Sequence, residues 1–306
     1  MTDDTRAHIR AVADRLGYRV HRTARALRVG GGLSIGLVTS YPADNPTDSD
    51  SRMDWYLQTA NAAARQALEQ ECALVLIPPL DQEAWTTLLP IDGALVIDPD
   101  PDSELLKSLL DRRLPVVAIG SAVNTLAVAS VSLDMRKAVE IAMHHLSAAG
   151  AKHPALVVDA IGRSSTETSL SAYRTWSQAN GVEAVIATTP ADERDRIEAG
   201  YRACSALLNA HPDIDGIYVP IDSIAAGCAK AVNRSHRTLG RDFHLITSEG
   251  KVASENTPPL SSIDNRRGEV AAAAVDLLIS ELRRRSTATS IVFEPTLIDR
   301  SQTGLS

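Results

Sequence analysis

Short apolar runs alternate with longer helix-like stretches along most of the chain from residue 34 onward. In the first half, four such runs end in Pro, Gly, Asp or Ser: SIGLVTS, ALVLIPP, GALVIDP and PVVAIGS. Runs of this length, apolar at consecutive positions, are typical of strands buried on both faces. Helical patterns lie between them at residues 55–70, 82–88 and 103–113. The alternation predicts βαβ units, with a parallel sheet covered by helices on both faces.

The same cycle restarts near residue 150. A long helix is expected at 135–149, and the sequence AAGAKHP ends it. Four more strand-like runs follow, PALVVDA, EAVIATT, GIYVPID and HLITSEG, with helices expected between them at 167–179, 192–209 and 223–235. A helix at 268–285 and a strand at 290–297 close the chain. The sequence therefore predicts an α/β fold of two tandem Rossmann-like parallel-sheet subdomains.

The return of the chain near its end predicts how the two subdomains divide it. The first subdomain is expected at 33–151 plus 264–289, and the second at 152–263 plus 290–306. The chain then crosses between them near 150–153, 262–266 and 288–291. Three crossings permit a hinge motion without free rotation of the halves.

Polar residues at strand ends are the first candidates for a binding site, because ligands of open parallel sheets bind outside the carboxyl ends of the strands. The residues at these positions are Ser40, Asp98, Ser121, Asp159, Asp222 and Glu249.

Charge is distributed unevenly along the chain. The 306 residues carry a formal charge of -7, yet residues 1–30 hold seven arginines against three aspartates. That segment is therefore +4 and the remainder -11. A basic arm joined by glycines to an acidic body indicates a segment that meets a polyanion, and a solvated helix face is the alternative.

Several classes of protein find no support in the sequence. The three cysteines are an odd number without a CxxC pair, which indicates reduced core residues rather than disulfides or a metal site. His144 and His145 are adjacent on a helical pattern and cannot face one metal together. The chain has no GxxxxGK[ST], HExxH or GxSxG motif, and the glycines at 30–32 precede a strand instead of following one. We therefore expect that the protein is not an enzyme and that it has no catalytic residue, bound metal or cofactor. The absence of an export signal or membrane span favours a cytoplasmic protein with no membrane partner.

The N-terminal segment TDDTRAHIRAVADRLGYRVHRTARALRVGGGLSIGLV resembles a junction found in LacI/GalR-type (lactose-repressor family) transcription regulators. In that family the last helix of a helix-turn-helix domain runs through LGY into a hinge helix and the first strand of the body. Four later segments, in the family's order, carry the same resemblance: VSLDMRKAVEIAMHHLSAAGAKHPALVV, GIYVPIDSIAAGCAKAV, TPPLSSID and DRSQTG. The resemblance implies a type I periplasmic-binding-protein-like fold.

Residues 1–32 are, by this resemblance, the remnant of a helix-turn-helix domain followed by the hinge helix. Leu27 matches the apolar wedge that partly unstacks a base step in the DNA minor groove. Arg22, Arg25 and Arg28 would contact phosphates, which give affinity but little sequence information. The family's two earlier helices, including the recognition helix, are absent from the chain as given. Either its start lies downstream of the natural one, or it is a regulator core without its reader.

The ligand site implied by the resemblance departs from the family's pattern. Ser169 occupies the slot of a family arginine in an RxxGY motif, and the family's Asn-Asp pair is Ile221-Asp222. The resemblance makes Asp222, Glu249 and Asp134 candidate ligand acceptors, and Ser169, Tyr41 and Trp55 complete the expected effector-binding set. Four of these residues have a structural alternative. Asp134 and Asp222 precede helices and are candidate caps, Glu249 a solvated loop residue, and Trp55 a core residue.

The sequence predicts an effector-responsive, homodimeric transcription regulator of the LacI type, acting as a repressor on a DNA operator. The effector is expected to be sugar-like and neutral or cationic. The alternative is a small-molecule binding or sensor protein of the periplasmic type without DNA-binding activity, which shares the two-subdomain architecture.

Overall fold

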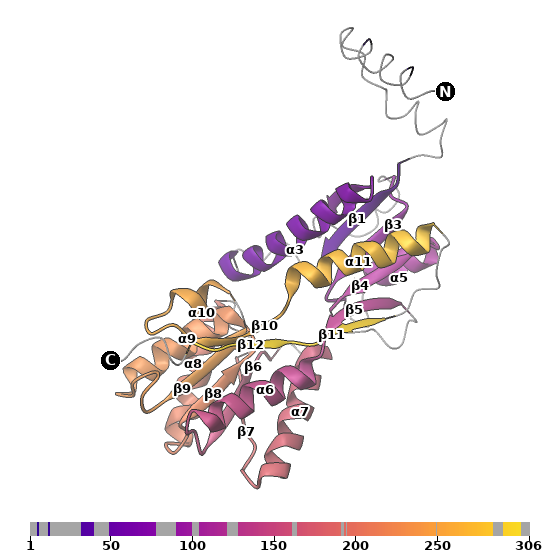
Figure 1. The fold of residues 1–306 in the computed structure, drawn as a ribbon. Coiled ribbons are helices and arrows are strands. Elements are labelled where there is room, and N and C mark those ends of the chain that lie inside the picture. Colours follow the sequence, from indigo (N-terminus) through magenta and orange to yellow (C-terminus); the bar gives the residue numbers. More distant parts are fainter. Residues whose placement is uncertain are drawn as a thin grey trace.

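The computed structural model describes residues 5, 12, 32–39, 49–77, 90–99, 104–120, 128–160, 164–190, 193, 195–248, 250–283 and 290–300, with the backbone alone for 39, 49–55 and 164. Two six-stranded sheets, each covered by helices on both faces, form two units of the molecule (Figure 1). This arrangement confirms the α/β fold class with two tandem, mainly parallel sheets.

The first unit is built on a sheet of strand order β11-β5-β4-β3-β1-β2, parallel throughout. Its strands are β1 (Ser34–Thr39), β2 (Ala73–Ile77), β3 (Gly93–Ile97), β4 (Val116–Ile119), β5 (Ala129–Leu133) and β11 (Ile291–Phe293). Helices α3 (Ser49–Glu69) and α11 (Arg267–Leu282) lie side by side on one face, and α5 (Glu104–Asp111) covers the other. Strands β3 and β4 are buried at every position, which explains their continuous apolar runs.

The second unit has the strand order β12-β10-β9-β8-β6-β7, with β12 antiparallel to β10 and the other pairs parallel. Its strands are β6 (Pro154–Val158), β7 (Val185–Thr188), β8 (Gly216–Val219), β9 (His244–Ser248), β10 (Ser261–Asp264) and β12 (Thr296–Ile298). Its helices are α6 (Met135–Ala148), α7 (Ser164–Asn180), α8 (Arg196–Ala210), α9 (Asp222–Arg234) and α10 (Lys251–Glu255). Helices α6 and α7 pack on one face of the sheet, and α8 and α9 on the other.

Helix α6 lies on the second sheet, which corrects the expected subdomain boundary at 151/152. Its buried face packs with residues of β6, β8, β9 and β10 in one core. The chain therefore first crosses between Leu133 at the end of β5 and Met135 at the start of α6, and not at 150–153. An apolar face predicts that a helix packs on a sheet, but its spacing does not say on which of two sheets.

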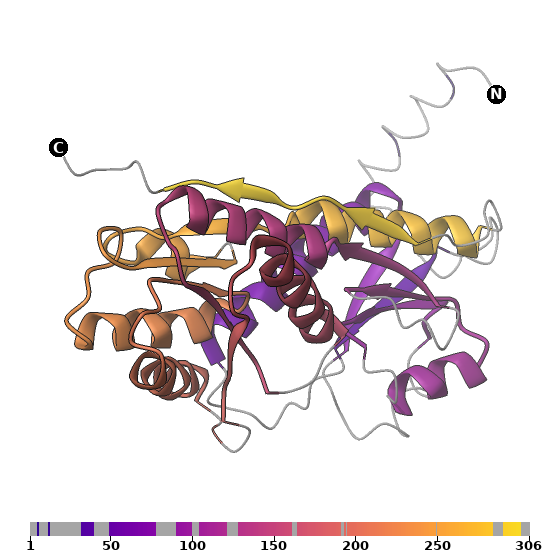
Figure 2. The same ribbon diagram turned by 90° about the horizontal axis from the view of Figure 1, so that it is seen from below.

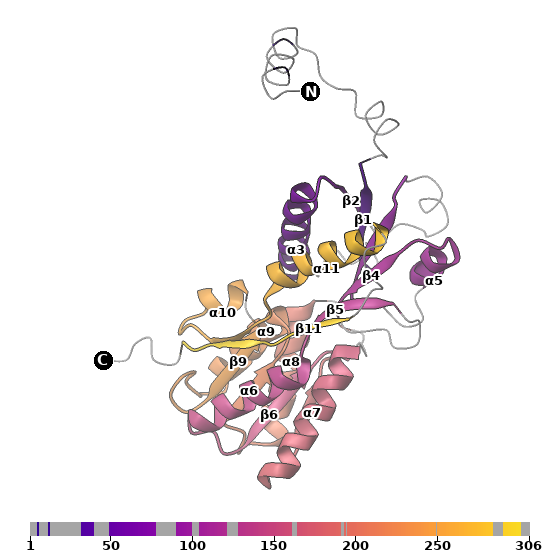
Figure 3. The same cartoon turned by 45° about the vertical axis from the view of Figure 1, so that its right-hand side comes forward.

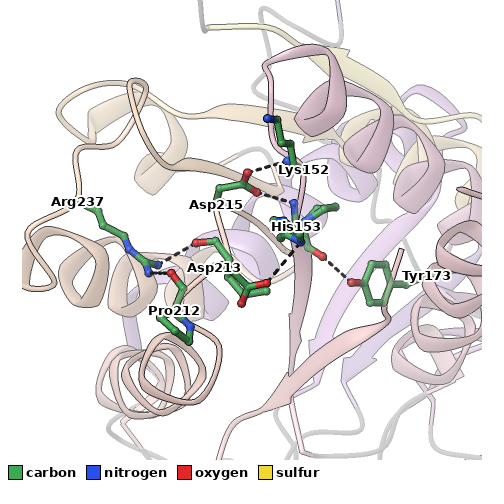
Figure 4. Close-up of polar contacts among 9 residues, drawn as sticks. Lys152, His153, Tyr173, Pro212, Asp213, Asp215 and Arg237 are labelled. Carbon is green, nitrogen blue, oxygen red and sulfur yellow. Dashed lines mark hydrogen bonds and ion pairs between the residues drawn. The ribbon is translucent and has the colours of Figure 1, made fainter. Parts of the chain in front are cut away.

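Residues 150–153 instead form a turn inside the second unit, at the amino ends of its strands. The carboxylate of Asp215 accepts the backbone N–H groups of Lys152 at 2.7 Å and His153 at 2.8 Å (Figure 4). The Tyr173 hydroxyl donates to the carbonyl of Pro154 at 2.7 Å. These bonds fix the start of β6 against β8 and α7, so the segment Gly-Ala-Lys-His-Pro forms a turn and not a crossing.

The expected terminal strand at 290–297 is two strands in different sheets. Strand β11 pairs with β5 of the first sheet and β12 with β10 of the second. Figure 2 shows them in yellow, passing in succession from one unit to the other. Pro295 lies between them, and it has no N–H to donate to a ladder. The third crossing is therefore at 293–296.

The second crossing, expected at 262–266, runs from Asp264 of β10 to Arg267 of α11. Arg266 between them adopts a left-handed conformation with φ 47°, and its N–H donates to the Asp264 carboxylate at 2.8 Å. In Figure 3 the two units lie one above the other and meet where β5, β11 and the start of α11 come together. The expected helix at 82–88 lies outside the described residues.

Candidate functional site

A cavity of about 240 Å³ lies between the two units, next to the carboxyl ends of their strands. Most of its described lining residues are polar or small. The first unit contributes Thr59, Asp98, Ile119, Gly120, Ser132, Leu133, Arg267 and Val270, and Asn265 lies in the second crossing. The second unit contributes Met135, Val158, Asp159, Ser165, Thr166, Ser169, Pro220, Ile221, Asp222 and Ser248. Because both units supply the walls, a ligand bound here would contact both at once.

Asp159 follows β6 and carries a buried ion pair into the cavity wall. Its carboxylate pairs with the guanidinium of Arg196, the first residue of α8, and the two side chains are 1% and 6% exposed. The Thr189 hydroxyl donates to the other Asp159 oxygen at 3.3 Å. Paired and hydrogen-bonded, this carboxylate is held in one orientation beside the cavity.

Asp222 lies at the carboxyl end of β8, where it lines the cavity as the first residue of α9. Ile221, and not Asp222, occupies the N-cap position of α9. The Asp222 carboxylate instead accepts the N–H of Val252 in α10 at 3.2 Å. Position 250 must be glycine for this contact, because a Cβ there would collide with the Asp222 carboxylate. Asp222 therefore joins the cavity to α10 rather than capping its own helix.

Asp134 caps α6, as its structural alternative predicts. The backbone N–H of Lys137 donates to its carboxylate at 3.0 Å. Its neighbours Leu133 and Met135 line the cavity, and Asp134 is not among the described lining residues. The effector-contact role expected for Asp134 is therefore not supported by its position.

Ser169 lines the cavity from α7 and is almost fully buried. Its hydroxyl donates to the carbonyl of Ser165 one turn earlier, at 2.8 Å. Ser165 and Thr166 line the same wall, so the first turns of α7 offer hydroxyl groups where the family pattern has a cation.

The first unit supplies a cation that the sequence reasoning missed. Arg267 begins α11, lines the cavity and is partly buried. Its Nη1 donates to Oε1 of Gln58 on α3 at 3.3 Å. Strand-end reasoning does not find this residue, because it follows a crossing rather than a strand. Strand-end reasoning did find Asp98, at the end of β3. The backbone of Asp98 has a φ of 41°, and its carboxylate packs against Gly120.

The other expected site residues cannot be placed. Tyr41 and Glu249, together with the DNA-binding set of Leu27, Arg22, Arg25 and Arg28, lie outside the described residues. Trp55 lies in α3, where its backbone alone is described.

Within the described ranges, no group of His, Cys, Asp or Glu side chains is arranged to hold a metal ion. The cysteines are buried and unbridged, as expected, and burial raises the pKa of the Cys72 and Cys228 thiols. None of the described helices combines the length and the apolar character that a membrane crossing needs.

Comparison with known families decides the assignment. Residues 143–303, just over half of the chain, match the model of the periplasmic binding protein-like domain. The chain belongs to this family. In the periplasmic binding protein-like framework, the cavity described above lies between the two units, with walls from α7 and α9 on one side and α11 on the other.

Relatives extend this similarity over nearly the whole chain. An uncharacterized HTH-type transcriptional regulator of Streptomyces limosus is 26% identical over 98% of this chain and 86% of its own length. The HTH-type transcriptional repressor MelR of Bacillus subtilis is 22% identical over 98% of this chain and 89% of its own. These matches confirm the resemblance to LacI/GalR-type regulators.

Solved structures of this type share the fold. A lac repressor dimer bound to operator and the anti-inducer ONPF has a TM-score of 0.79 at 18% identity, covering 99% of this chain and 91% of that one. A complex of the transcriptional regulator CelR with cellobiose has a TM-score of 0.77 at 19% identity, covering 98% and 90%.

Proposed function

We propose that this chain is a LacI-type transcriptional regulator, acting as a repressor, whose operator binding is controlled by a small effector in the cavity between the two units. The observation that carries the proposal is a cavity walled by both units in a chain whose relatives are transcription regulators along nearly its full length. Such a protein acts on DNA in the cytoplasm, as a homodimer.

The cavity favours a one-ring, sugar-like effector. Its volume of about 240 Å³ lies below the range of roughly 300–1,000 Å³ that is typical of sites for drug-sized ligands. Its walls present carboxylate acceptors at Asp98 and Asp222 and hydroxyl groups along α7. A polyol ring offers donors to the carboxylates and acceptors to the hydroxyls, so it can pair with both.

The charges around the cavity favour a neutral effector over an anionic one. Three carboxylates, Asp98, Asp159 and Asp222, line it together with the single guanidinium of Arg267 among the described residues. Asp159 is already paired with Arg196. A ligand carboxylate or phosphate would therefore meet a net negative wall, and an imperfectly paired buried anion costs several kcal/mol.

The effector would act by changing the relative stability of open and closed arrangements of the two units. Because three segments cross between them, the units can hinge but not rotate freely. Closing the two units would alter the distance between the two hinge segments of a dimer. The predicted DNA contacts in each hinge segment are Arg22, Arg25, Leu27 and Arg28. The coupling free energy is no larger than the difference in effector affinity between the two arrangements.

A thermal-shift screen tests the effector site. D-ribose, D-glucose, cellobiose and glucose 6-phosphate are compared, and we expect a one-ring neutral sugar to give the largest midpoint shift. Asp222→Asn should weaken that sugar about tenfold or more, because a hydrogen bond to a charged group contributes roughly 1.5–3 kcal/mol. Ser169→Arg should also reduce the shift by filling the cavity.

Asp134→Asn is the matched control, since Asn replaces Asp as a helix cap at little cost and the residue lies outside the described lining. If glucose 6-phosphate is the best stabiliser and Asp222→Asn leaves its shift unchanged, the effector assignment is wrong. The sensor alternative is tested by fluorescence anisotropy of the protein with labelled duplex DNA from upstream of its gene. Binding that does not respond to the sugar, or no binding, favours a sensor without DNA-binding activity.

A further inference from the structure

Two consecutive arginines at the second crossing have different surroundings. Arg266 forms an ion pair with Glu269, with Nη2 to Oε2 at 2.6 Å, and its guanidinium lies 5.0 Å from the centre of the Phe293 ring. Arg267, the next residue, lines the cavity and donates to Gln58 of α3. The left-handed backbone at Arg266 turns the chain into α11 and so separates the directions of the two side chains.

The wall opposite Arg267 is rich in acceptors. Asp222 and Asp159 line the same cavity from the second unit, and both are largely buried. A ligand seated between a guanidinium on one unit and carboxylates on the other receives donors from one side and acceptors from the other. Closing the two units would shorten both sets of bonds together.

Helix α3 connects this contact with the surface of the first unit. Three successive residues of α3 have three different surroundings. Thr59 is buried and lines the cavity, Gln58 accepts the hydrogen bond from Arg267, and Leu57 is 51% exposed. Packing of α3 along α11 makes the pair one body, so a change at Arg267 acts on α3 directly.

We propose that Arg267 is the specificity-determining cation of the effector site and that its bond to Gln58 conveys the ligand-bound state to α3. This inference rests on the proposed function and identifies how the site reads its ligand. Arg267 donates to a ligand oxygen from the first unit while Asp222 accepts ligand hydroxyls from the second. The ligand thereby joins the two units.

Isothermal titration with D-ribose, D-glucose and cellobiose tests the binding role in wild type, Arg267→Met, Arg267→Lys and Arg266→Met. For the sugar that wild type binds best, we expect Arg267→Met to weaken affinity at least tenfold, which corresponds to about 1.4 kcal/mol. Arg267→Lys should recover part of the loss, because an ammonium keeps the charge but not the planar donors. Arg266→Met removes the same charge one residue away and should bind within twofold of wild type.

Hydrogen exchange of the α3 amides tests the coupling. In wild type, saturating sugar should slow exchange of the amides of residues 57–61 relative to the sugar-free protein. In Gln58→Leu the sugar affinity should change less than threefold, and the slowing of exchange should be much smaller. If Arg267→Met binds within twofold of wild type, or Gln58→Leu keeps full protection, the inference is wrong while the effector site stands. If wild type binds none of the three sugars, the proposed function fails and this inference with it. If Arg267→Met unfolds at the assay temperature, Arg267→Lys is used in its place. The sugar affinity of Arg267→Lys must then lie between that of wild type and no detectable binding.

Discussion

The buried ion pair between Asp159 and Arg196 gives the sharpest test of how the cavity wall is held. Substituting Arg196→Met removes the cation and leaves a carboxylate whose side chain is 1% exposed. Thr189 remains as a donor to that carboxylate, but a neutral hydroxyl does not balance a buried charge. Removing one partner of a buried pair typically costs about 3–5 kcal/mol. We therefore expect Arg196→Met to lower the free energy of unfolding by roughly that amount.

The same helix provides a matched control. Arg202 on α8 pairs with Glu193 at 3.4 Å, and these two side chains are 49% and 25% exposed. Exposed pairs contribute about 0–1 kcal/mol, so Arg202→Met should change the free energy of unfolding by no more than that. Both variants lose an arginine from α8, and they differ in burial of the pair.

Urea denaturation followed by circular dichroism measures both variants and the double variant Asp159→Asn with Arg196→Met. The amide of Asn can keep the Thr189 contact without a charge, so the double variant should regain about 2–3 kcal/mol over Arg196→Met. The reasoning is refuted if Arg196→Met and Arg202→Met are equally stable, or if the double variant is less stable than Arg196→Met alone.

Two strands, β5 and β10, were overlooked in the sequence, and both carry buried hydroxyl groups. Strand β5 contains Ser130, which bonds to the Ser290 hydroxyl at 3.2 Å. Strand β10 contains Ser262, whose hydroxyl accepts from Arg300 at 2.7 Å. These partners lie 160 and 38 residues away in the chain. A local pattern of apolar residues cannot show that a serine is buried and paired with so distant a group.

The sequence predicted those residues of the candidate site whose positions follow from the strand topology alone. Asp98, Asp159 and Asp222 come together because the carboxyl ends of parallel strands share one edge of each sheet. The position of Arg267 depends instead on where the chain crosses between units and on the left-handed turn at Arg266. The sequence pattern therefore did not reveal the cation of the cavity, since Ser169 leaves its slot uncharged while Arg267 enters from the other unit.

Three further predictions address packing, assembly and pH. Gly227→Ala should destabilise by about 1–3 kcal/mol in thermal unfolding, because its Cβ would collide with the α8 backbone at Ile197. Gly268→Ala, where nothing lies within 4 Å, should be neutral or stabilise by up to about 1 kcal/mol, and equal losses at both sites would contradict the packing argument. The chain should sediment as a dimer at micromolar concentration, and monomer alone across that range would contradict the proposed assembly. Partial burial lowers the pKa of His244 below its ordinary value, and His145 adds to this against the opposing Asp215 and Asp242. The unfolded chain then takes up a proton at a higher pH than the folded one, so this group's contribution to stability is present above about pH 6.5 and is lost as the pH falls. His244→Gln should therefore lose less free energy of unfolding than wild type between about pH 7.5 and 5.5, and parallel pH profiles in urea melts would show that the imidazole has no such role.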